Sequence, residues 1–235
     1  MIAALFVQRG GCYFGLPDVD PWDEARDARL YAGPHPVIAH PPCARWGRLA
    51  GHAHSRGAPA PGEDGGCFAS ALASVRKWGG VLEHPAWSAA WPAHGLPRPP
   101  AFGWARDLDG SWSCEVSQGY YGHRADKLTW LYYVGELPPT PLRWGRPTRQ
   151  DGPWMPCMED CGEWWCTAHG AHVFECPCQP VEEWSTSPYA AERTSKGRRR
   201  GVVETMTRTE RAATPPAFRD VLLDIARSCR RSEAA

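Results

Sequence analysis

The sequence contains no long apolar run, and this absence argues against a membrane-spanning helix. Such a helix needs roughly 18 or more consecutive apolar residues, and no stretch of the chain approaches that length. The start of the chain also lacks the basic segment of a secretion signal, because residues 1–7 are apolar and Gln8 and Arg9 follow at once. We therefore expect a cytoplasmic protein that is not associated with a membrane.

A net charge is also absent, since 26 basic side chains balance 26 acidic ones. The balance is not local, because residues 191–235 contain 11 Lys and Arg against 6 Asp and Glu. Within this segment Arg198, Arg199 and Arg200 form a compact basic run. Such a run is suited to contacts with phosphate, although a solvated tail has the same composition.

Disulfide bonds are not expected, although the chain has ten cysteines. Cysteines that cluster with histidines in a chain without a secretion signal favour a metal site. The cluster consists of Cys157, Cys161, Cys166, His169, His172, Cys176 and Cys178. Zinc binds four such ligands in a tetrahedron, so the segment predicts structural zinc. Redox-active cysteines or a chance cluster are the alternatives.

The cluster holds more ligands than one tetrahedral site needs and one fewer than two separate sites need. The best single set combines Cys166, Cys176 and Cys178 with either His169 or His172. Cys157 and Cys161 could replace members of that set or help to hold a second ion. A metal here would hold together a small module that has little core of its own.

Alternating strand-like and helix-like segments predict an α/β fold. Short apolar runs predict buried strands at residues 2–7, 36–40, 81–82 and 130–134. Apolar periodicity predicts a helix over 66–78, ended by Gly79 and Gly80, and a final helix that begins after Thr214. The composition of residues 21–31 favours a further helix. Residues 51–65, rich in Gly, Pro and His, are expected to form a loop.

Two reactive side chains follow predicted strands. Cys43 ends the segment 39–43 (AHPPC), and Glu83 comes directly after residues 81–82. Chemistry gathers at the carboxyl ends of strands in open α/β sheets, so both side chains can face one pocket. A thiolate can add to C6 of cytosine while a carboxyl group hydrogen-bonds N3, and C5 then becomes nucleophilic. A chance Pro-Pro-Cys turn remains an alternative, and the adjacent His40 and His84 either tune Cys43 or hydrogen-bond within their loops.

Several motifs occur in a characteristic order. They are residues 5–11 (LFVQRGG), 19–21 (VDP), 41–43 (PPC), 118–135 (QGYYGHRADKLTWLYYVG) and 208–219 (RTERAATPPAFR), together with Glu83. This order resembles that of the DNA cytosine-C5 methyltransferases. The resemblance implies that Cys43 is the nucleophile and that Glu83 assists it. It also implies an abbreviated Rossmann-like sheet of the S-adenosylmethionine-dependent methyltransferase type, with a small zinc-stabilised insertion.

The resemblance further implies the ligands of the protein. The residues expected to hold S-adenosylmethionine are Phe6, Gly10, Gly11, Asp20 and Pro41. Those expected to contact double-stranded DNA with a flipped cytosine are Arg124, Lys127, Arg198, Arg199 and Arg200. The similarity to compact phage enzymes implies a monomeric transferase that works in a bacterial or phage-infected cell.

Two departures from the family pattern leave other functions open. Gln8 stands where the family has the first glycine of its cofactor loop, and the segment between Asp20 and Cys43 is too short for a further strand and helix. The alternatives are a different C5-pyrimidine modification by the same Cys–Glu chemistry and a non-catalytic, zinc-stabilised DNA-binding protein. The expected organisation is a catalytic domain (1–140), a zinc-binding target-recognition module (141–190), and a basic segment with a helix returning to the catalytic domain (191–235).

Overall fold

The computed structural model describes residues 1–47, 50–123, 127–136, 139, 141–145 and 212–229, and the backbone of residues 154–156, 164–166 and 171–172. The chain forms two compact units. The first comprises Met1–Val116, Leu128–Gly145 and Pro216–Ala235, and the second comprises Ser117–Lys127 and Arg146–Pro215. No helix within the described ranges is long and apolar enough to cross a membrane.

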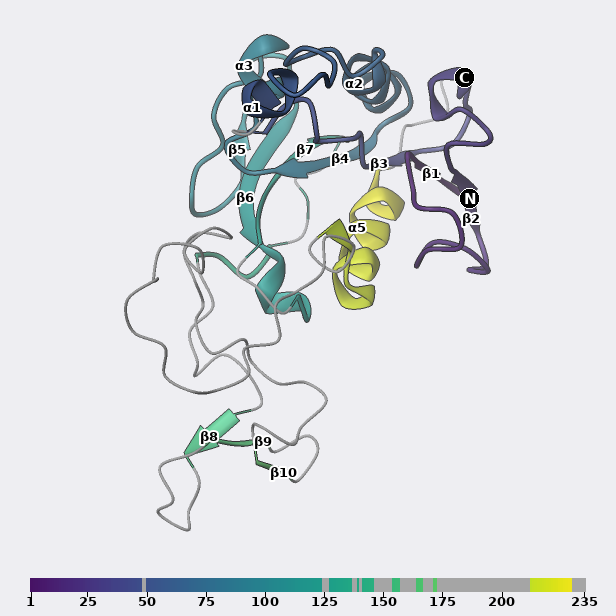
Figure 1. Ribbon diagram of the computed structural model, residues 1–235. Helices are drawn as coiled ribbons and strands as arrows, with labels where there is room; N and C mark the ends of the chain where they lie inside the picture. The colour runs from purple at the N-terminus through teal and green to yellow at the C-terminus, as the bar shows by residue number, and fades with distance from the viewer. Residues whose placement is uncertain are drawn as a thin grey trace, which may run out of the picture. The chain divides into compact units, whose positions relative to one another are not determined.

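A seven-stranded mixed sheet forms the framework of the first unit (Figure 1). Its strands are β1 (Ile2–Leu5), β2 (Val19–Trp22), β3 (Val37–Ala39), β4 (Gly80–Pro85), β5 (Ala105–Arg106), β6 (Trp112–Ser117) and β7 (Leu128–Val134). The order across the sheet is β2-β1-β3-β4-β7-β6-β5. Strands β2, β1, β3 and β4 are parallel neighbours, whereas β7 runs antiparallel to β4 and β5 antiparallel to β6. The predicted α/β class is confirmed.

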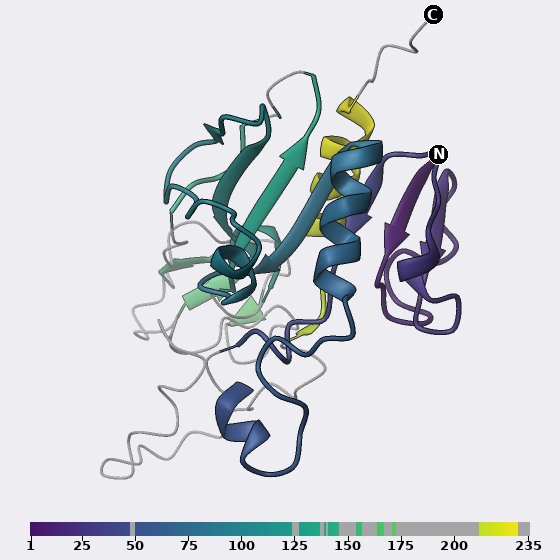
Figure 2. The ribbon, with the colours of Figure 1, turned by 90° about the horizontal axis from the view of Figure 1, so that it is seen from above.

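Two amphipathic helices cover opposite faces of the parallel part of this sheet (Figures 1 and 2). Helix α2 (Cys67–Trp78) packs on β3, β4 and β7, and helix α5 (Pro216–Ser228) packs on β1, β3 and β4. The apolar side chains they bury include Phe68, Ala71, Leu72 and Val75 from α2, and Phe218, Leu222, Leu223 and Ile225 from α5. Each helix therefore forms because one apolar stripe finds a sheet face to cover.

A close approach of two strands explains the glycine pair after α2. A Cβ atom on Gly80 would lie 2.0 Å from the carbonyl oxygen of Val37. Glycine at this position therefore lets β4 start directly beside β3, and Gly79, with φ of +76°, ends the helix just before it.

The predicted strands and both long helices are present. The strand expected at 81–82 continues to Pro85, so Glu83 lies inside it and not after it as predicted. Two further expectations are wrong. Residues 21–31 do not form a helix, because β2 extends through Pro21 to Trp22 and only a 3-10 turn, η1 (Ala28–Leu30), follows. Proline is tolerated there because β2 is an edge strand. Residues 51–65 are not wholly loop, since α1 (Ala50–His54) occupies their start. A short helix α3 (Ala90–Ala93) follows β4.

The second unit contains short elements. A 3-10 turn, η2 (Gln118–Tyr121), begins where the Ser117 hydroxyl accepts a hydrogen bond from the backbone N–H of Gly119. A three-stranded antiparallel sheet has the order β10-β9-β8 and consists of β8 (Trp154–Pro156), β9 (Trp164–Cys166) and β10 (Ala171–His172).

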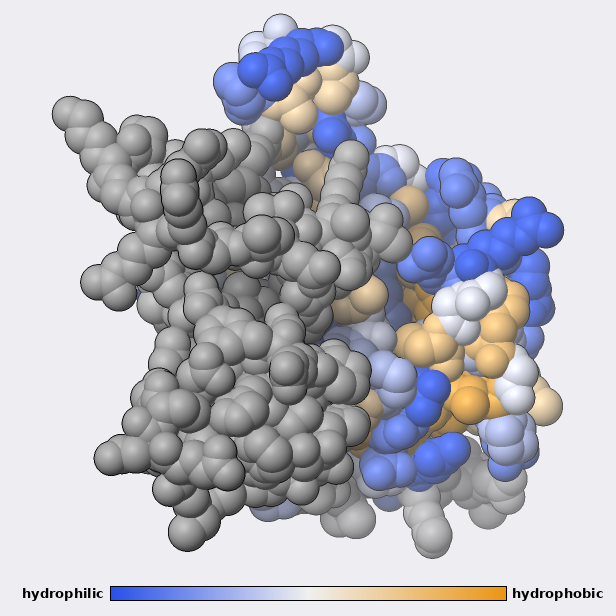
Figure 3. All heavy atoms as spheres, turned by 60° about the horizontal axis from the view of Figure 1, so that its bottom comes forward, coloured by the Kyte–Doolittle hydropathy of each residue, from blue (hydrophilic) through white to orange (hydrophobic). Residues whose placement is uncertain are grey.

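Some large apolar side chains remain at the surface of the first unit. Leu108 and Phe102 are exposed near β5, Leu30 lies in η1, and Trp87 follows β4 with 51% of its surface exposed. One face of the molecule shows apolar side chains gathered among hydrophilic ones (Figure 3). Single exposed apolar residues are ordinary in folded proteins, so an exposed side chain gains significance only from its surroundings.

Candidate functional site

The carboxyl ends of β1 and β3 lie side by side, next to the middle of the longer strand β4. The register pairs Leu5 of β1 with Ala39 of β3, and Ala39 with Leu82 of β4. His40 directly follows β3, and Glu83 lies inside β4 beside it, so the register brings the two side chains together where β3 ends. From β1 the chain goes to β2 on one side and then to β3 and β4 on the other. Open α/β sheets bind their ligands beside such a reversal of strand order.

Three side chains form a hydrogen-bonded chain at this end of β3. The Tyr13 hydroxyl lies 2.8 Å from Nε2 of His40, and Nδ1 of His40 lies 2.8 Å from Oε2 of Glu83. The side chains of His40 and Glu83 are 12% and 8% exposed. With a proton on Nδ1, the imidazole donates to the carboxylate and accepts from the tyrosine. Burial holds the pKa of Tyr13 well above 10, so its hydroxyl keeps its proton.

Cys43 lies in the loop after β3 and begins a turn. The backbone N–H of Trp46 closes this turn by donating to the carbonyl oxygen of Cys43, at 3.0 Å. Of the five cysteines whose side chains are described, only Cys43 is exposed. Burial raises the pKa of the Cys12 and Cys67 thiols and raises that of Cys114 much further. Since the thiolate is the reactive form, Cys43 is the described cysteine best placed to attack an external electrophile.

His84 adjoins Glu83 in β4 but faces the opposite side of the strand, as alternate residues do. Its ring packs against Phe68 of α2 and Trp91 of α3, at centroid distances of 5.2 Å and 6.5 Å. The side chain is fully buried, and its polar neighbour is the backbone of Pro42, which neither ring nitrogen meets in a well-formed hydrogen bond. Burial lowers the pKa of His84 to about 4, and the charges of Glu83 and Asp64 and the Pro42 backbone oppose this shift only in part. His84 is therefore a neutral core residue at pH 7.

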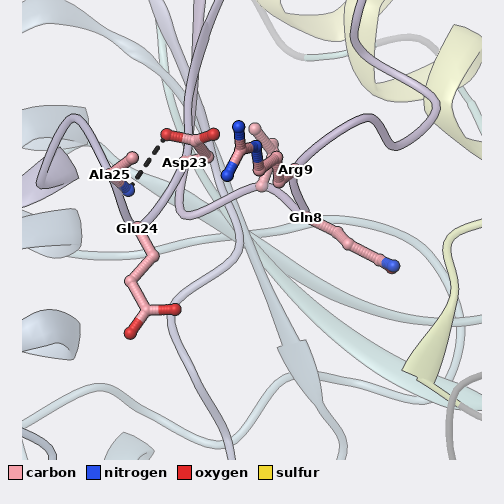
Figure 4. Close-up of a pocket in the computed structure, with 6 residues that line it drawn as sticks. Gln8, Arg9, Asp23, Glu24 and Ala25 are labelled. Carbon is pink, nitrogen blue, oxygen red and sulfur yellow. Dashed lines mark hydrogen bonds between the residues drawn. The ribbon is translucent and has the colours of Figure 1, made fainter.

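A surface hollow of about 340 Å³ lies beyond the carboxyl ends of β1 and β2 (Figure 4). Its lining residues are Val7, Gln8, Arg9, Asp23, Glu24 and Ala25. The Arg9 side chain extends toward Asp23, whereas those of Gln8 and Glu24 point away from it. Oδ1 of Asp23 accepts hydrogen bonds from the N–H groups of Ala25 and Arg26, at 3.1 Å and 3.2 Å. Within the described residues Oδ2 accepts none, and Asp23, although only 7% exposed, forms part of the lining of the hollow.

The acidic residue at the end of β2 is Asp23 and not Asp20. Asp20 is the second residue of the strand, where its carboxylate accepts a 2.7 Å hydrogen bond from Nε1 of Trp22 and pairs with Arg26 at 2.5 Å. Burial raises the pKa of Asp20, but the hydrogen bonds from Arg26 and Trp22 outweigh it and lower the pKa overall. Because the strand continues through Pro21, Asp20, one of the residues expected to hold a cofactor, lies inside β2 and is paired there.

The hollow is lined by none of the five residues predicted to hold a cofactor, which include Pro41 in the loop after β3. Phe6 directly follows β1 with φ of 58°, a left-handed conformation that is rare for a bulky residue. Gly10 has φ of +66°, and a Cβ on Gly11 would lie 2.9 Å from the carbonyl oxygen of Gln8. The loop after β1 therefore needs these glycines for its own turn.

The residues predicted to contact DNA lie mostly outside the described residues, which do not include Arg124, Arg198, Arg199 and Arg200. Lys127 is described, and its ammonium group donates to the carbonyl oxygens of Ala212 and Ala213 at 3.2 Å and 3.3 Å. These bonds join residue 127 to the segment that precedes α5.

Two of the predicted zinc ligands lie on described backbone. Cys166 in β9 pairs with Ala171, and His172 in β10 pairs with Trp165. The other five candidates, Cys157, Cys161, His169, Cys176 and Cys178, lie outside the described residues. In the part of the chain that is described, no group of three or more His, Cys, Asp and Glu side chains could hold a metal.

Sequence reasoning missed two residues of this site. Asp23 directly follows β2, a strand that the sequence analysis did not predict. No local pattern marks Tyr13, because its partner His40 is 27 residues away in the chain. No protein-family model matches the chain, and no curated protein or solved structure matches it either. The function of the site is therefore inferred from its chemistry.

Proposed function

We propose that this protein modifies C5 of cytosine in double-stranded DNA, with Cys43 as the nucleophile and Glu83 as the assisting acid. The most direct form of this reaction is methyl transfer from S-adenosylmethionine. One observation carries the proposal: His40, at the end of β3, holds the buried carboxyl group of Glu83, and the exposed thiol of Cys43 follows His40 by three residues. The order of motifs along the chain supports the same chemistry.

Cys43 and Glu83 would act on opposite parts of one ring. The thiolate of Cys43 adds to C6 of the cytosine, and the electron pair of the C5–C6 double bond moves toward C5. The Glu83 carboxyl group, protonated on one oxygen while the other accepts from His40, donates its proton to N3 and so neutralises the charge that develops on the ring. C5 then takes the transferred group. Loss of the C5 proton to water and return of the N3 proton to Glu83 restore the double bond and expel the Cys43 thiolate. His40 and Tyr13 support this step as positioning residues, because their hydrogen bonds fix the direction of the carboxyl group.

The hollow beyond β1 and β2 fits the nucleoside part of S-adenosylmethionine. Its volume of about 340 Å³ is within the usual range of small-molecule sites. Oδ2 of Asp23 can accept from a ribose hydroxyl group, and Val7 and Ala25 offer apolar surface for a base. When bound, this cofactor supplies an electrophilic methyl group. Asp23 thus takes the role first predicted for Asp20.

Nucleoside analysis of treated DNA tests the proposed reaction. DNA incubated with the protein and S-adenosylmethionine is digested and its nucleosides are measured by mass spectrometry, with 5-methylcytosine as the expected product. Glu83→Ala should lower the rate on the order of 100-fold or more, as loss of a positioned acid does. The matched control is Glu63→Ala, because Glu63 is an exposed carboxylate that bonds only its own loop.

Each outcome of this experiment has a clear meaning. A modified cytosine heavier than 5-methylcytosine would show that a different group is transferred to C5 by the same Cys–Glu chemistry. DNA left unchanged by the wild-type protein would contradict the proposed reaction and favour the non-catalytic DNA-binding alternative. Equal loss of rate in Glu83→Ala and Glu63→Ala would remove Glu83 from the mechanism.

We also propose that the Cys/His cluster binds structural zinc. Its thiolate and imidazole donors are those that zinc prefers, and β9 and β10 bring Cys166 and His172 onto neighbouring strands. Elemental analysis of the purified protein should find about one or two zinc ions per chain. Cys166→Ser should lower the zinc content, whereas Cys67→Ser, outside the cluster, should not. A chain without zinc, or an unchanged content in Cys166→Ser, would refute the site.

A further inference from the structure

Trp87 is a half-exposed aromatic residue in a strained backbone conformation. Its φ of 65° is in the left-handed region that bulky side chains avoid, and 51% of its surface is exposed. Such a conformation is unfavourable, persists only where the surrounding structure holds it, and is often found at functional sites. Half of the Trp87 surface packs within the fold, and the other half is available to an external partner.

The loop that holds Trp87 is joined to the loop that holds Cys43. Ala86 continues the ladder of β4 by donating to the carbonyl oxygen of Leu128, at 3.0 Å. Two residues beyond Trp87, the N–H of Ala89 donates to the carbonyl oxygen of Trp46, also at 3.0 Å. Trp46 closes the turn of Cys43. Trp87 therefore belongs to the same edge of the sheet as the proposed nucleophile.

An arginine covers one face of the Trp87 ring. Cζ of Arg98 lies 3.9 Å from the ring centroid, and the neighbouring Trp130 supports the indole at a centroid distance of 5.6 Å. Trp130 is itself fixed, because its Nε1 donates to Glu115 at 2.8 Å. A guanidinium over an indole face contacts the ring with its own flat face, so the N–H groups at its edge can still donate to a phosphate. Arg98 is exposed, so these donors are accessible.

We infer that Trp87 and Arg98 form a nucleotide-binding platform. Trp87 stacks against a base that has left the duplex stack beside Cys43, and Arg98 contacts an adjacent phosphate. Aromatic stacking and a nearby cation are the usual means of holding unstacked nucleotides. The inference deepens the proposed function and rests on it for the identity of the nucleic acid, which is DNA with an extruded cytosine.

Fluorescence anisotropy tests the platform with a labelled DNA duplex that carries one mispaired cytosine, because mispairing lowers the cost of extruding a base. Trp87→Ala should weaken binding by on the order of tenfold, and Trp87→Phe should restore most of the affinity. Arg98→Gln should lower the slope of log Kd against log salt concentration by about 0.9, the contribution of one phosphate contact. A fully paired duplex should respond less to Trp87→Ala.

Two surface variants serve as matched controls. Phe102→Ala removes an aromatic side chain that is 71% exposed, and Arg106→Gln removes a cation that lies over Trp112 at 5.7 Å. Both should bind DNA as the wild type does. Circular dichroism melts check folding, and Trp87→Phe and Arg98→Gln keep the test valid if the alanine variant unfolds. Wild-type affinity in Trp87→Ala, or an equal loss in Phe102→Ala, would overturn the platform.

The platform and the proposed reaction fail in different ways. If the wild type forms a covalent complex with DNA but Trp87→Ala binds and reacts equally well, only the platform is wrong. If Trp87 is needed for DNA binding but no covalent complex or modified base forms, the platform stands and the proposed reaction is wrong. A wild-type protein that binds no DNA would overturn both.

Discussion

Replacing Cys43 with serine is expected to abolish a covalent complex that the wild-type protein forms with DNA containing 5-fluorocytosine. In the proposed reaction Cys43 is released only after a proton has been removed from C5. 5-Fluorocytosine carries fluorine in place of that hydrogen, so the proton cannot be removed and the thioether bond to C6 persists. A serine hydroxyl stays protonated at neutral pH and adds to C6 far more slowly than a thiolate.

The complex would be measured on denaturing gels and by mass spectrometry, with S-adenosylmethionine present. The matched control is Cys12→Ser, because the Cys12 thiol is half-buried and its pKa is raised by burial. This variant should form as much complex as the wild type. A complex that survives in Cys43→Ser would assign attack to another residue. The absence of any complex in the wild type would refute covalent catalysis.

Acidification is expected to destabilise the protein through His84. Its pKa is lowered from 6.5 to about 4 in the folded state, so between these values the unfolded chain binds more protons than the folded chain. The stability that neutral His84 provides is therefore fully present above pH 6.5 and is lost as the pH falls toward 4. This difference in the pKa of His84 between the unfolded and folded states corresponds to about 3 kcal/mol in the free energy of unfolding.

Urea unfolding at pH 7.5 and pH 5 measures this effect. His84 should account for about 2 kcal/mol of the difference between the two pH values, which span part of its titration. His84→Phe keeps an aromatic ring beside Phe68 and Trp91 and should remove that part of the difference. The exposed His52, changed to Gln, should leave it unchanged. An identical pH dependence in the wild type and His84→Phe would show that His84 titrates normally.

Much of the fold could be predicted because local patterns agree with the tertiary structure. The apolar stripe of residues 66–78 forms α2, and the glycines after it are required by the close approach of β4 to Val37. The strand before Cys43 ends at Ala39, close to its predicted end. These features depend on residue spacing and backbone sterics, which a single sequence displays.

Other features depend on contacts between distant residues. Pro21 argues against a strand locally, yet it is acceptable because β2 lies at the sheet edge, a fact of topology. The Tyr13–His40–Glu83 chain joins three segments, and Glu83 is 43 positions after His40 in the chain. The importance of Trp87 depends on its φ angle and on Arg98. None of these can be read from a local pattern.

The position of α5 has a consequence for the order of events during synthesis. This helix covers the face of β1, β3 and β4, and Arg219 in it donates to the carbonyl oxygen of Cys12, 207 residues earlier. Because the N-terminal part of a chain leaves the ribosome first, these strands emerge long before the helix that covers them. One apolar face of the nascent sheet thus stays exposed until late in translation. During that time chaperones or other chains can bind to it.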